Sequence, residues 1–335
     1  MTVEQYALAH NLSICRILNG MWQVSGAHGK INPKSAIDDM VGYNAAGLTS
    51  WDMADIYGPA EEIFGAFRQK IKSELGDEES AKITALTKFV PHPTTMSYSF
   101  VEHSIAKSLS RMRVPIIDAV QFHWWDYENP NYLDAMRHLS DMRDRGKIRH
   151  VALTNFDTQR MQEMVDHGFG FVSNQVQYSI IDQRPSVKME RFCKQNKIRI
   201  LAYGVLCGGF ISEKYIGRPE PRIQSLDTAS LQKYKNMIDM WGGWDLFQKL
   251  LLILDKIAKK HGVSIANVAM RYILDKPQVA GIIIGARLGI SSNYLDNLNV
   301  FRLRLDSDDR AQINDFSLQS NNLFSMIGDC GDEYR

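Results

Sequence analysis

The amino-acid sequence predicts an α/β protein, a (β/α)8 TIM barrel with a long insertion between its seventh and eighth strands. Short apolar runs rich in β-branched residues alternate with segments of helical periodicity, a pattern typical of parallel strands joined by crossover helices. Eight such runs occur, and eight strands close a barrel of this class. The chain has 335 residues, 44% of them apolar, which suits two ordinary domains or one large barrel. The strand count favours one domain that spans residues 1–335.

The predicted elements alternate along the chain. The candidate strands are residues 14–24, 48–54, 82–90, 116–124, 149–156, 171–179, 198–206 and 279–286. The candidate helices are residues 33–47, 61–75, 99–112, 131–147, 158–168 and 186–197. We expect Gly47 to lie just beyond the end of the first helix, where glycine is favoured. Asp157 or Thr158 is expected to begin the fifth helix, and Pro185 with Ser186 the sixth.

One interval breaks this regular spacing. The stretch from Cys207 to Gln278 separates the seventh strand from the eighth, and loops that follow barrel strands often carry function. The helical pattern at residues 245–262 is interpreted as an added packing helix. The run at residues 235–244, with two methionines and two tryptophans, is interpreted either as a mobile lid or as part of the core.

Composition and charge exclude several classes of protein. Lysine and arginine (39) nearly balance aspartate and glutamate (38), so the net charge of +1 gives no reason to expect a nucleic-acid or membrane partner. The cysteines form no C-x-x-C pair, which predicts reduced thiols rather than a zinc site or disulfides. No signal-like N-terminus or long apolar window occurs. We therefore expect a soluble, cytoplasmic protein, and the sequence sets neither an oligomeric state nor a protein partner.

Four polar residues lie at or just beyond the ends of three consecutive candidate strands. They are Asp52, Tyr57, Lys88 and His123. Active sites of such barrels lie at the carboxyl ends of the strands. Each residue alone has a structural explanation, because Asp52 suits a helix cap, Lys88 a solvated strand end and His123 a buried core position. Their occurrence on consecutive strands favours a shared catalytic site.

These residue types suit acid catalysis on a carbonyl group. A tyrosine hydroxyl has an ordinary pKa of about 10 and is a weak acid near neutral pH unless its anion is stabilised. A lysine ammonium beside Tyr57 would lower that pKa, and Asp52 would keep Lys88 charged and oriented. A hydrogen bond from His123 would polarise the carbonyl. This chemistry still requires a source of electrons.

The runs DMADIYGPAEEIFG, LTKF, QFHWWD and GKIRHVALTNF occur in this order, and with them the chain resembles the aldo-keto reductase superfamily. The resemblance extends from Leu18 to Asn297 and is to the longer-looped branch, which includes bacterial reductases and proteins similar to potassium-channel β-subunits. It implies a carbonyl reductase that uses NAD(P)H without a Rossmann fold, and no G-x-G-x-x-G motif is present. It also implies that Tyr57 is the general acid.

The same resemblance implies a set of cofactor contacts. Thr154, Asn155 and Gln175 would hold the nicotinamide amide, and Tyr203 would stack on its ring. A glycine-containing loop would approach the pyrophosphate, aided by Lys214 and Arg222. The full implied set is Gly20, Met21, Trp22, Asp52, Thr154, Asn155, Gln175, Tyr203, Gly204, Val205, Leu206, Gly208, Lys214, Arg222, Gly285, Arg287, Asn293, Asp296 and Asn297.

The implied cofactor is NADP(H), with NAD(H) as the alternative. Arg287 would face the 2′-phosphate, since arginine is the natural partner of a phosphate dianion. Asn293 stands where many members of the family carry arginine or glutamine, which keeps NAD(H) open.

Aromatic residues at the strand ends predict an apolar substrate pocket for a small carbonyl compound. The expected lining is Trp22, Tyr57, Phe89, His123 and Trp124. Trp124 and Trp125 are neighbours on a strand and should point to opposite faces, so one of the two is expected to line the pocket.

The sequence leaves two functions other than a reductase open. A nicotinamide-binding regulatory subunit with little turnover is the main alternative, because such subunits in the superfamily can retain all four catalytic residues. A flavin- or metal-dependent barrel fits less well, since the histidines are dispersed and form no metal-binding spacing. No bound metal is therefore expected.

Overall fold

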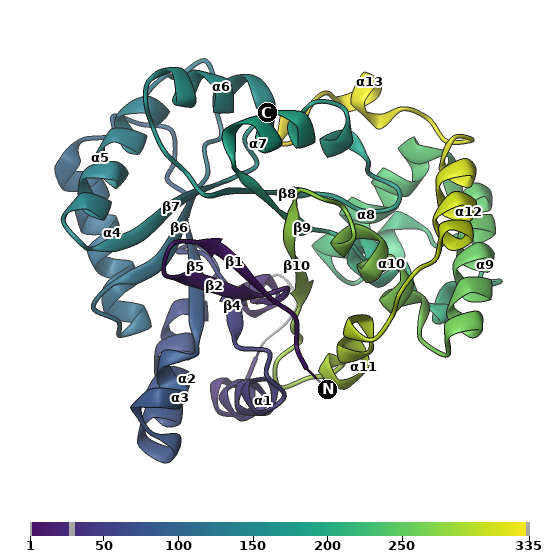
Figure 1. Ribbon diagram of the computed structural model, residues 1–335, viewed down its shortest axis with the longest axis horizontal. Helices are drawn as coiled ribbons and strands as arrows, with labels where there is room; N and C mark the ends of the chain where they lie inside the picture. The colour runs from purple at the N-terminus through teal and green to yellow at the C-terminus, as the bar shows by residue number, and fades with distance from the viewer. Residues whose placement is uncertain (1, 27–30, 333–335) are drawn as a thin grey trace.

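The barrel predicted from the sequence is confirmed. The computed structural model describes residues 2–26 and 31–332, and eight parallel strands close a barrel in the order β10-β3-β4-β5-β6-β7-β8-β9. Helices surround it (Figure 1). The strands are β3 (Ile17–Gly20), β4 (Ser50–Asp52), β5 (Thr84–Phe89), β6 (Ile117–Phe122), β7 (Ile148–Thr154), β8 (Ser173–Gln177), β9 (Arg199–Tyr203) and β10 (Val279–Gly285).

An antiparallel hairpin precedes the barrel and was not predicted. It consists of β1 (Gln5–Ala9) and β2 (Leu12–Cys15). Its apolar residues Leu8, Leu12 and Ile14 are buried in one cluster with Leu18 from the interior of the barrel, so the hairpin covers one end of the barrel (Figure 1). The expected first strand at residues 14–24 is therefore wrong in extent: β2 and β3 share it, and Trp22–Ser25 form a 3-10 turn, η1.

The helices between the strands follow the expected order. They are α1 (Pro33–Ala45), α2 (Ala60–Leu75), α3 (Asp77–Ala81), α4 (Tyr98–Met112), α5 (Tyr132–Asp144), α6 (Thr158–Asp166), α7 (Met189–Asn196) and α10 (Ile265–Leu274). Asp157 caps α6, because its side chain accepts the Arg160 N–H at 2.6 Å. Pro185 and Ser186 do not begin a long helix: they lie in a short 3-10 turn, η2 (Arg184–Ser186), and α7 starts at Met189.

The insertion between β9 and β10 is largely helical. It contains the 3-10 turns η3 (Cys207–Gly209), η4 (Glu213–Tyr215) and η5 (Ile223–Ser225), followed by α8 (Ala229–Trp241) and α9 (Gly243–His261). Met237, Trp241 and Trp244 are buried in the main core. The run at residues 235–244 is thus core packing rather than a lid, and α9 packs its apolar side inward as expected for an added helix.

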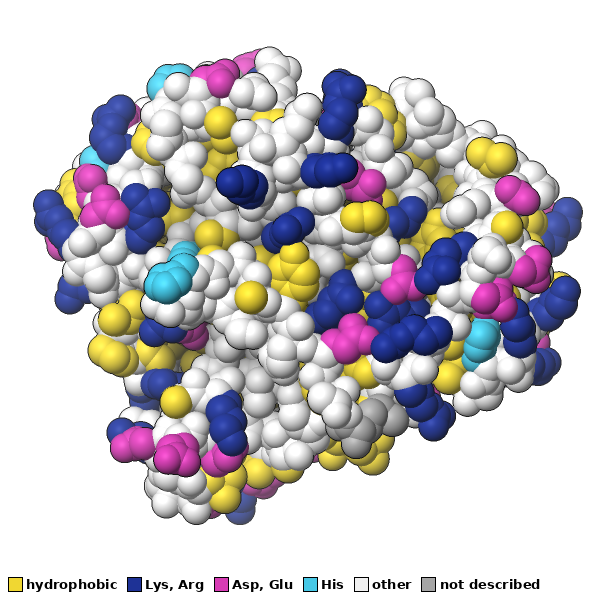
Figure 2. Space-filling view, viewed as in Figure 1, with side chains coloured by type: hydrophobic (Ala, Val, Ile, Leu, Met, Phe, Trp, Pro, Cys, Tyr) yellow, Lys and Arg dark blue, Asp and Glu magenta, His cyan; other side chains and the backbone are white. Residues whose placement is uncertain are grey.

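Three helices and a 3-10 turn follow the last strand. They are α11 (Tyr294–Asn297), η6 (Leu298–Phe301), α12 (Ser307–Ser317) and α13 (Leu323–Ile327), and the last two run along one side of the barrel (Figure 1). Among the residues that the structure describes, no helix combines the length and apolar character that a bilayer crossing requires. Lys and Arg side chains lie beside Asp and Glu side chains on the face seen in Figure 2.

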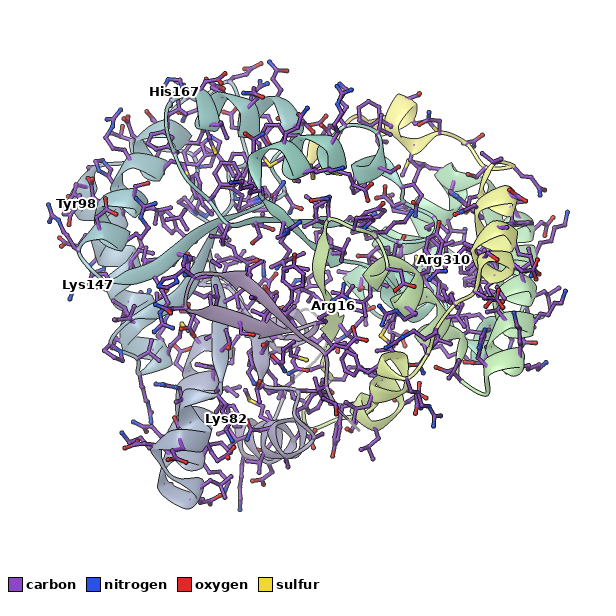
Figure 3. All side chains as sticks on the ribbon, viewed as in Figure 1. Arg16, Lys82, Tyr98, Lys147, His167 and Arg310 are labelled. Atoms are coloured by element: carbon purple, nitrogen blue, oxygen red, sulfur yellow. The ribbon has the colours of Figure 1, made fainter. Side chains whose placement is uncertain are left out.

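The barrel closes where its first strand meets its last. Residues 17–20 of β3 pair with residues 282–285 of β10. Just before this seam the Arg16 guanidinium donates to the carbonyl oxygens of Leu274, Val279 and Ala280 at 2.5, 2.9 and 3.2 Å, and it pairs with Glu4 at 3.2 Å. Arg16 lies beside β10 in Figure 3. One side chain therefore joins the N-terminal segment to the turn that leads into the last strand.

Helices α2 and α4 approach each other unusually closely. A Cβ atom at Gly65 would lie 2.4 Å from the Arg111 carbonyl oxygen, a distance that no side chain tolerates without a backbone shift. The Arg111 guanidinium reaches across the same contact to Glu61 at 3.4 Å and Glu62 at 3.1 Å. This crossing places α4 directly behind the loop that follows β4.

Candidate active site

The cavity at the carboxyl ends of the strands has a volume of about 670 Å³, within the range of small-molecule sites. It receives residues from all eight barrel strands or the loops that follow them, and from α8. The predicted site residues that line it are Gly20, Trp22, Asp52, Tyr57, Lys88, His123, Thr154, Asn155, Gln175, Tyr203, Gly204, Val205, Leu206, Gly208, Lys214, Gly285, Arg287, Asn293, Asp296 and Asn297. All four predicted catalytic residues thus meet at one cavity.

Asp52 and Lys88 form a buried ion pair at the floor of this cavity. The Lys88 ammonium lies 2.6 Å from Asp52 Oδ2 and also donates to the Met53 carbonyl oxygen at 3.2 Å. Their side chains are only 4% and 6% exposed. Burial lowers the pKa of Lys88, and the carboxylate of Asp52 opposes that shift. Lys88 is therefore a desolvated ammonium held charged by its partner.

Two amide side chains fix the other oxygen of Asp52. Gln121 and Gln175 donate to Asp52 Oδ1 at 2.7 and 2.6 Å, and Gln175 also donates to Gln121 Oε1 at 2.8 Å. Gln121 was not selected from the sequence. It lies two residues before His123 on a strand, so both side chains face the barrel interior, and that spacing is the signal that could have found it.

Tyr57 lies on the turn that follows β4. Its N–H donates to the Ala54 carbonyl oxygen at 3.1 Å, which makes residues 54–57 a tight turn. The Lys88 ammonium is 5.2 Å from the centre of the Tyr57 ring. A cation at this distance stabilises a tyrosinate anion, as the proposed acid chemistry requires.

His123 lies on the next strand end along the barrel. Its Nδ1 is 3.2 Å from the Thr154 carbonyl oxygen, and since a carbonyl only accepts, Nδ1 carries a hydrogen. The Trp125 ring meets the imidazole edge to face, with the ring centres 4.3 Å apart. These two contacts fix the orientation of the imidazole ring.

Polar groups continue along the strand ends towards β9. Thr154 donates through its hydroxyl to the Gln175 carbonyl oxygen at 3.0 Å. Asn155 adopts a positive φ of 57°, and its Oδ1 accepts the Tyr203 hydroxyl at 3.0 Å. The ring of Tyr203 is 5.2 Å from the Lys233 ammonium. Tyr203 is thus oriented by its hydroxyl while its ring borders the cavity.

The loop after β9 is shaped by glycine. Gly204, Gly208 and Gly209 have φ values of 72°, 66° and 101°, a conformation that side chains rarely adopt. A Cβ at Gly204 would lie 2.3 Å from the Tyr234 hydroxyl, and one at Gly208 would lie 3.0 Å from Ser230 Oγ. The main chain of this loop therefore borders the cavity without side chains in between.

Four predicted contact residues do not line the cavity, and the structure corrects them. Phe89 and Trp124 are 2% and 0% exposed and point away from the barrel interior, because each follows an inward residue on its strand. Phe89 stacks on Phe122, and the Trp124 indole N–H donates to the carbonyl oxygens of Asp126 and Asn129. Trp125 borders the cavity in place of Trp124.

The other two corrections concern predicted cofactor residues. Met21 is fully buried, and only its backbone N–H approaches the site, donating to the Asp52 carbonyl oxygen at 2.9 Å. Arg222 begins the turn η5 and is exposed outside the cavity. Sequence reasoning also missed several lining residues from α8 and the loops, namely Ile56, Val90, Ser230, Lys233 and Tyr234. Ile56 and Val90 follow the ends of β4 and β5 and could have been found from their positions beside Tyr57 and two residues after Lys88. Nothing in the spacing of the three α8 residues relates them to the strand ends.

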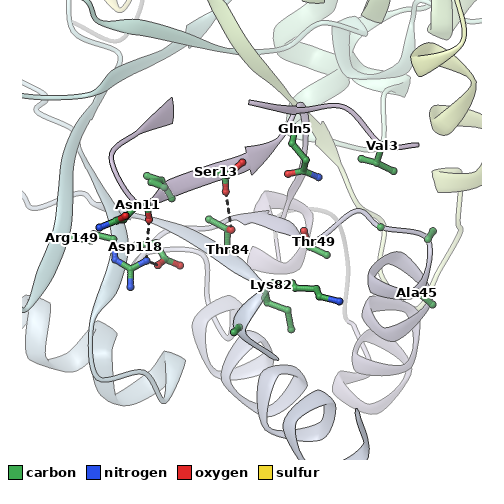
Figure 4. Close-up of a pocket in the computed structure, with 15 residues that line it drawn as sticks. Val3, Gln5, Asn11, Ser13, Ala45, Thr49, Lys82, Thr84, Asp118 and Arg149 are labelled. Atoms are coloured by element: carbon green, nitrogen blue, oxygen red, sulfur yellow. Dashed lines mark hydrogen bonds and ion pairs between the residues drawn. The ribbon is translucent and has the colours of Figure 1, made fainter. Parts of the chain in front are cut away.

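A second cavity, of about 650 Å³, lies at the opposite end of the barrel beside the hairpin (Figure 4). Asp118 and Arg149 pair there at 3.0 Å, and Thr84 donates to the Ser13 carbonyl oxygen at 3.2 Å. Its lining contains none of the predicted site residues. Within residues 2–26 and 31–332, no three or more His, Cys, Asp or Glu side chains gather as a metal-binding group.

Comparison with known proteins assigns the chain to a family. The model of the Aldo/keto reductase family matches residues 16–317. The chain belongs to this family. It is 25% identical to the aldo-keto reductase YhdN of Bacillus subtilis over 93% of this chain and 92% of that protein. It is also 25% identical to flagellar radial spoke protein 5 of Chlamydomonas reinhardtii, but covers only 49% of that longer protein.

A solved structure supports the same fold. The glycerol dehydrogenase from Gluconobacter oxydans matches 95% of this chain and 96% of its own with a TM-score of 0.78 at 20% identity. Membership makes this aldo/keto reductase an oxidoreductase of carbonyl compounds that uses a nicotinamide cofactor. The residues present fit a dinucleotide: the exposed main chain of the glycine loop suits a pyrophosphate, and Lys214 and Arg287 supply positive charge at the same cavity.

Proposed function

We propose that this protein reduces an aldehyde or ketone to an alcohol with NADPH, and that Tyr57 is the general acid. The observation that carries the proposal is the buried Asp52–Lys88 pair at 2.6 Å, with the ammonium 5.2 Å from the Tyr57 ring. A buried ammonium stabilises the tyrosinate that remains once Tyr57 has given up its proton. Asp52, held by Gln121 and Gln175, keeps that ammonium charged.

The proposed roles of the chain's residues follow from their bonds. A bound reduced nicotinamide supplies the hydride that the carbonyl carbon receives. Tyr57 donates the proton that the carbonyl oxygen needs, and Lys88 stabilises the remaining negative charge. His123, whose Nδ1–H is directed to the Thr154 carbonyl oxygen, donates from Nε2 to the substrate oxygen when its ring is protonated. Thr154, Asn155 and Gln175 would hold the nicotinamide amide.

NADPH is proposed over NADH because of Arg287. This exposed side chain lines the cavity, as do Asn293, Asp296 and Asn297. A guanidinium pairs with a phosphate dianion through two parallel hydrogen bonds, and it has no equivalent partner on a ribose hydroxyl.

The proposed substrate is a small, mainly apolar carbonyl compound. Trp22, Ile56 and Trp125 are 37%, 54% and 36% exposed and border the same cavity as Tyr57. Exposed apolar side chains at a cavity mouth are typical of ligand contacts. We place this reaction in the cytoplasm, where Cys15, Cys193 and Cys207, buried thiols whose pKa burial raises to about 12, stay reduced.

Tyr57→Phe tests the mechanism. The variant keeps the ring beneath the Lys88 ammonium but lacks the proton, so turnover of small aldehydes should fall by about 10²-fold or more. Binding of NADPH, measured by quenching of tryptophan fluorescence, should stay within about twofold of the wild-type value. Tyr98→Phe, which removes a hydroxyl bonded to Arg145 outside the cavity, is the matched control. Unchanged turnover in Tyr57→Phe would disprove the assignment.

A second candidate is a nicotinamide-binding subunit with little turnover, which draws on the likeness to a flagellar radial spoke protein. Wild-type protein that binds NADPH tightly, yet turns over none of a panel of aliphatic and aromatic aldehydes, would favour this function instead.

A further inference from the structure

A carboxylate that lines no part of the catalytic cavity ties the Tyr57 turn to the barrel. Asp55 lies two residues before Tyr57, and both of its side-chain oxygens accept the Val90 N–H, at 3.3 and 3.2 Å. Its own N–H donates to the Lys88 carbonyl oxygen at 3.1 Å. The turn is therefore joined to the end of β5 by the two main-chain groups that flank Phe89, directly after Lys88.

The charges that face Asp55 come from every element packed around it. Lys88 on β5 interacts favourably with its carboxylate, as does Arg111 on α4, while Glu61 on α2 repels it. Arg111 donates to the Asp55 carbonyl oxygen at 3.2 Å and pairs with Glu61 at 3.4 Å. Thr87 further fixes Glu61 through a hydrogen bond of 2.7 Å. Lys88 thus has a second carboxylate near it besides Asp52.

We propose that Asp55 is a positioning residue of the reductase: its carboxylate holds the Tyr57 turn against β5 and helps to keep the proton on Lys88. The proposal rests on the proposed function of Tyr57 and Lys88. Asp55 itself touches neither substrate nor cofactor, since it does not line the cavity. Asp55 acts on the Tyr57 turn through its hydrogen bond with the Val90 N–H, and on Lys88 through the attraction between carboxylate and ammonium.

The charge of Asp55 changes within a useful range of pH. Burial raises the pKa of Asp55 to about 6, so the carboxylate is mainly ionised above pH 6 and mainly neutral below it. An anion beside an ammonium raises the pKa of that ammonium. Removal of the Asp55 charge should therefore lower the pKa of Lys88 and let it lose its proton at a lower pH.

Asp55→Asn tests this without any need for turnover. Asparagine can still accept the Val90 N–H through its amide oxygen but carries no charge. The protein is labelled with ¹³C at lysine Cε, and the Lys88 signal is assigned by its absence in Lys88→Met. We expect Lys88 in Asp55→Asn to titrate at least about half a pH unit lower than in the wild type. The same midpoint in both proteins would overturn the proposal.

The matched control is Asp118→Asn. Asp118 is another carboxylate whose pKa burial raises, and it accepts the Ala85 N–H at the beginning of β5 at 3.0 Å. It lies at the other end of the barrel, so its loss should leave the Lys88 midpoint unchanged. An equal shift in both variants would contradict the proposal, because it would mark a general effect of losing a buried carboxylate.

Two further measurements keep the inference separate from the proposed function. In the wild type the chemical shift of the Val90 amide should change with a midpoint near pH 6. A shift that stays constant between pH 4 and 8 overturns the proposal even if Asp55→Asn does not fold.

If the enzyme reduces aldehydes, the alkaline loss of kcat should move to lower pH in Asp55→Asn. An absence of turnover in every variant contradicts the reductase, whereas the Lys88 titration still decides the role of Asp55.

Discussion

Asp52 and Lys88 are ionic side chains removed almost completely from water. Such a pair adds little to stability compared with apolar side chains of the same volume, because both charges lose their hydration. Four hydrogen bonds from Lys88, Gln121 and Gln175 compensate for that loss. A cluster of this kind is retained for its chemistry, and it accounts for the buried polar residues Asp52, Lys88, Gln121 and Gln175 on the four barrel strands β4, β5, β6 and β8.

Arg287→Gln tests the proposed cofactor preference at the level of one residue. Loss of the guanidinium should weaken NADPH binding by about 10-fold or more, since hydrogen bonds to charged groups contribute about 1.5–3 kcal/mol. NADH binding should change little, because that cofactor lacks the 2′-phosphate. Both affinities are measured by isothermal titration calorimetry.

Arg222→Gln is the control for this measurement, because Arg222 is a cation of the β9–β10 insertion that does not line the cavity. Equal weakening of NADPH and NADH in Arg287→Gln would show that Arg287 does not discriminate between them.

At the scale of elements, alternation along strands explains both the successes and the errors of the sequence predictions. Lys88 and His123 point into the barrel, and their neighbours Phe89 and Trp124 therefore point out. The apolar pattern located these strands but left open which face of each was the interior. If Lys88 is a catalytic residue that faces the interior, the same rule places Phe89 on the outside.

Other features depend on contacts that a local pattern does not record. The run at residues 14–24 resembles one strand because apolar residues lie on both sides of Arg16 and of Gly20. In the structure the strands are interrupted at both places. Lys233 and Tyr234 reach the cavity only because α8 packs on the glycine loop. The spacing of residues along the sequence does not predict how an inserted helix packs. Residues at the carboxyl ends of the strands, in contrast, lie at the same end of any parallel barrel and can be predicted to meet.

The close crossing of α2 and α4 yields a prediction about packing. Gly65→Ala should destabilise the protein by about 1–3 kcal/mol, because the added methyl group meets the Arg111 carbonyl oxygen and the two helices must separate. Gly170→Ala is the control, since its Cβ would have only an ordinary contact at 3.8 Å with Arg143. Urea unfolding followed by circular dichroism gives both free energies, and equal stability of the two variants would contradict the argument.

At the scale of the whole molecule, the ring of strands ties the two ends of the chain together. Every strand of the barrel has a neighbour on each side, and the main core continues from residues near the N-terminus to Cys330. No segment of the described chain has a core separate from the barrel. We therefore expect residues 1–335 to unfold as one domain.

This expectation is tested at the closing seam with Arg16→Met. Loss of the guanidinium leaves three carbonyl oxygens with fewer donors, and it should destabilise the whole barrel by about 2 kcal/mol or more. The midpoint of urea unfolding should shift by the same amount whether it is measured by tryptophan fluorescence or by far-ultraviolet circular dichroism. Arg137→Met, which removes an exposed pair with Asp134, should change stability by less than about 0.5 kcal/mol. Two separate transitions would contradict a single domain.

The pairing of β3 with β10 also determines how late in synthesis the barrel can close. Residue 20 has no partner on that side until residue 285 has left the ribosome, a delay on the order of ten seconds or more at ordinary elongation rates. Throughout that time one edge of β3 is open to pairing with another chain. The strand exposes only four residues and ends in glycine, and so short an edge is a poor template for aggregation.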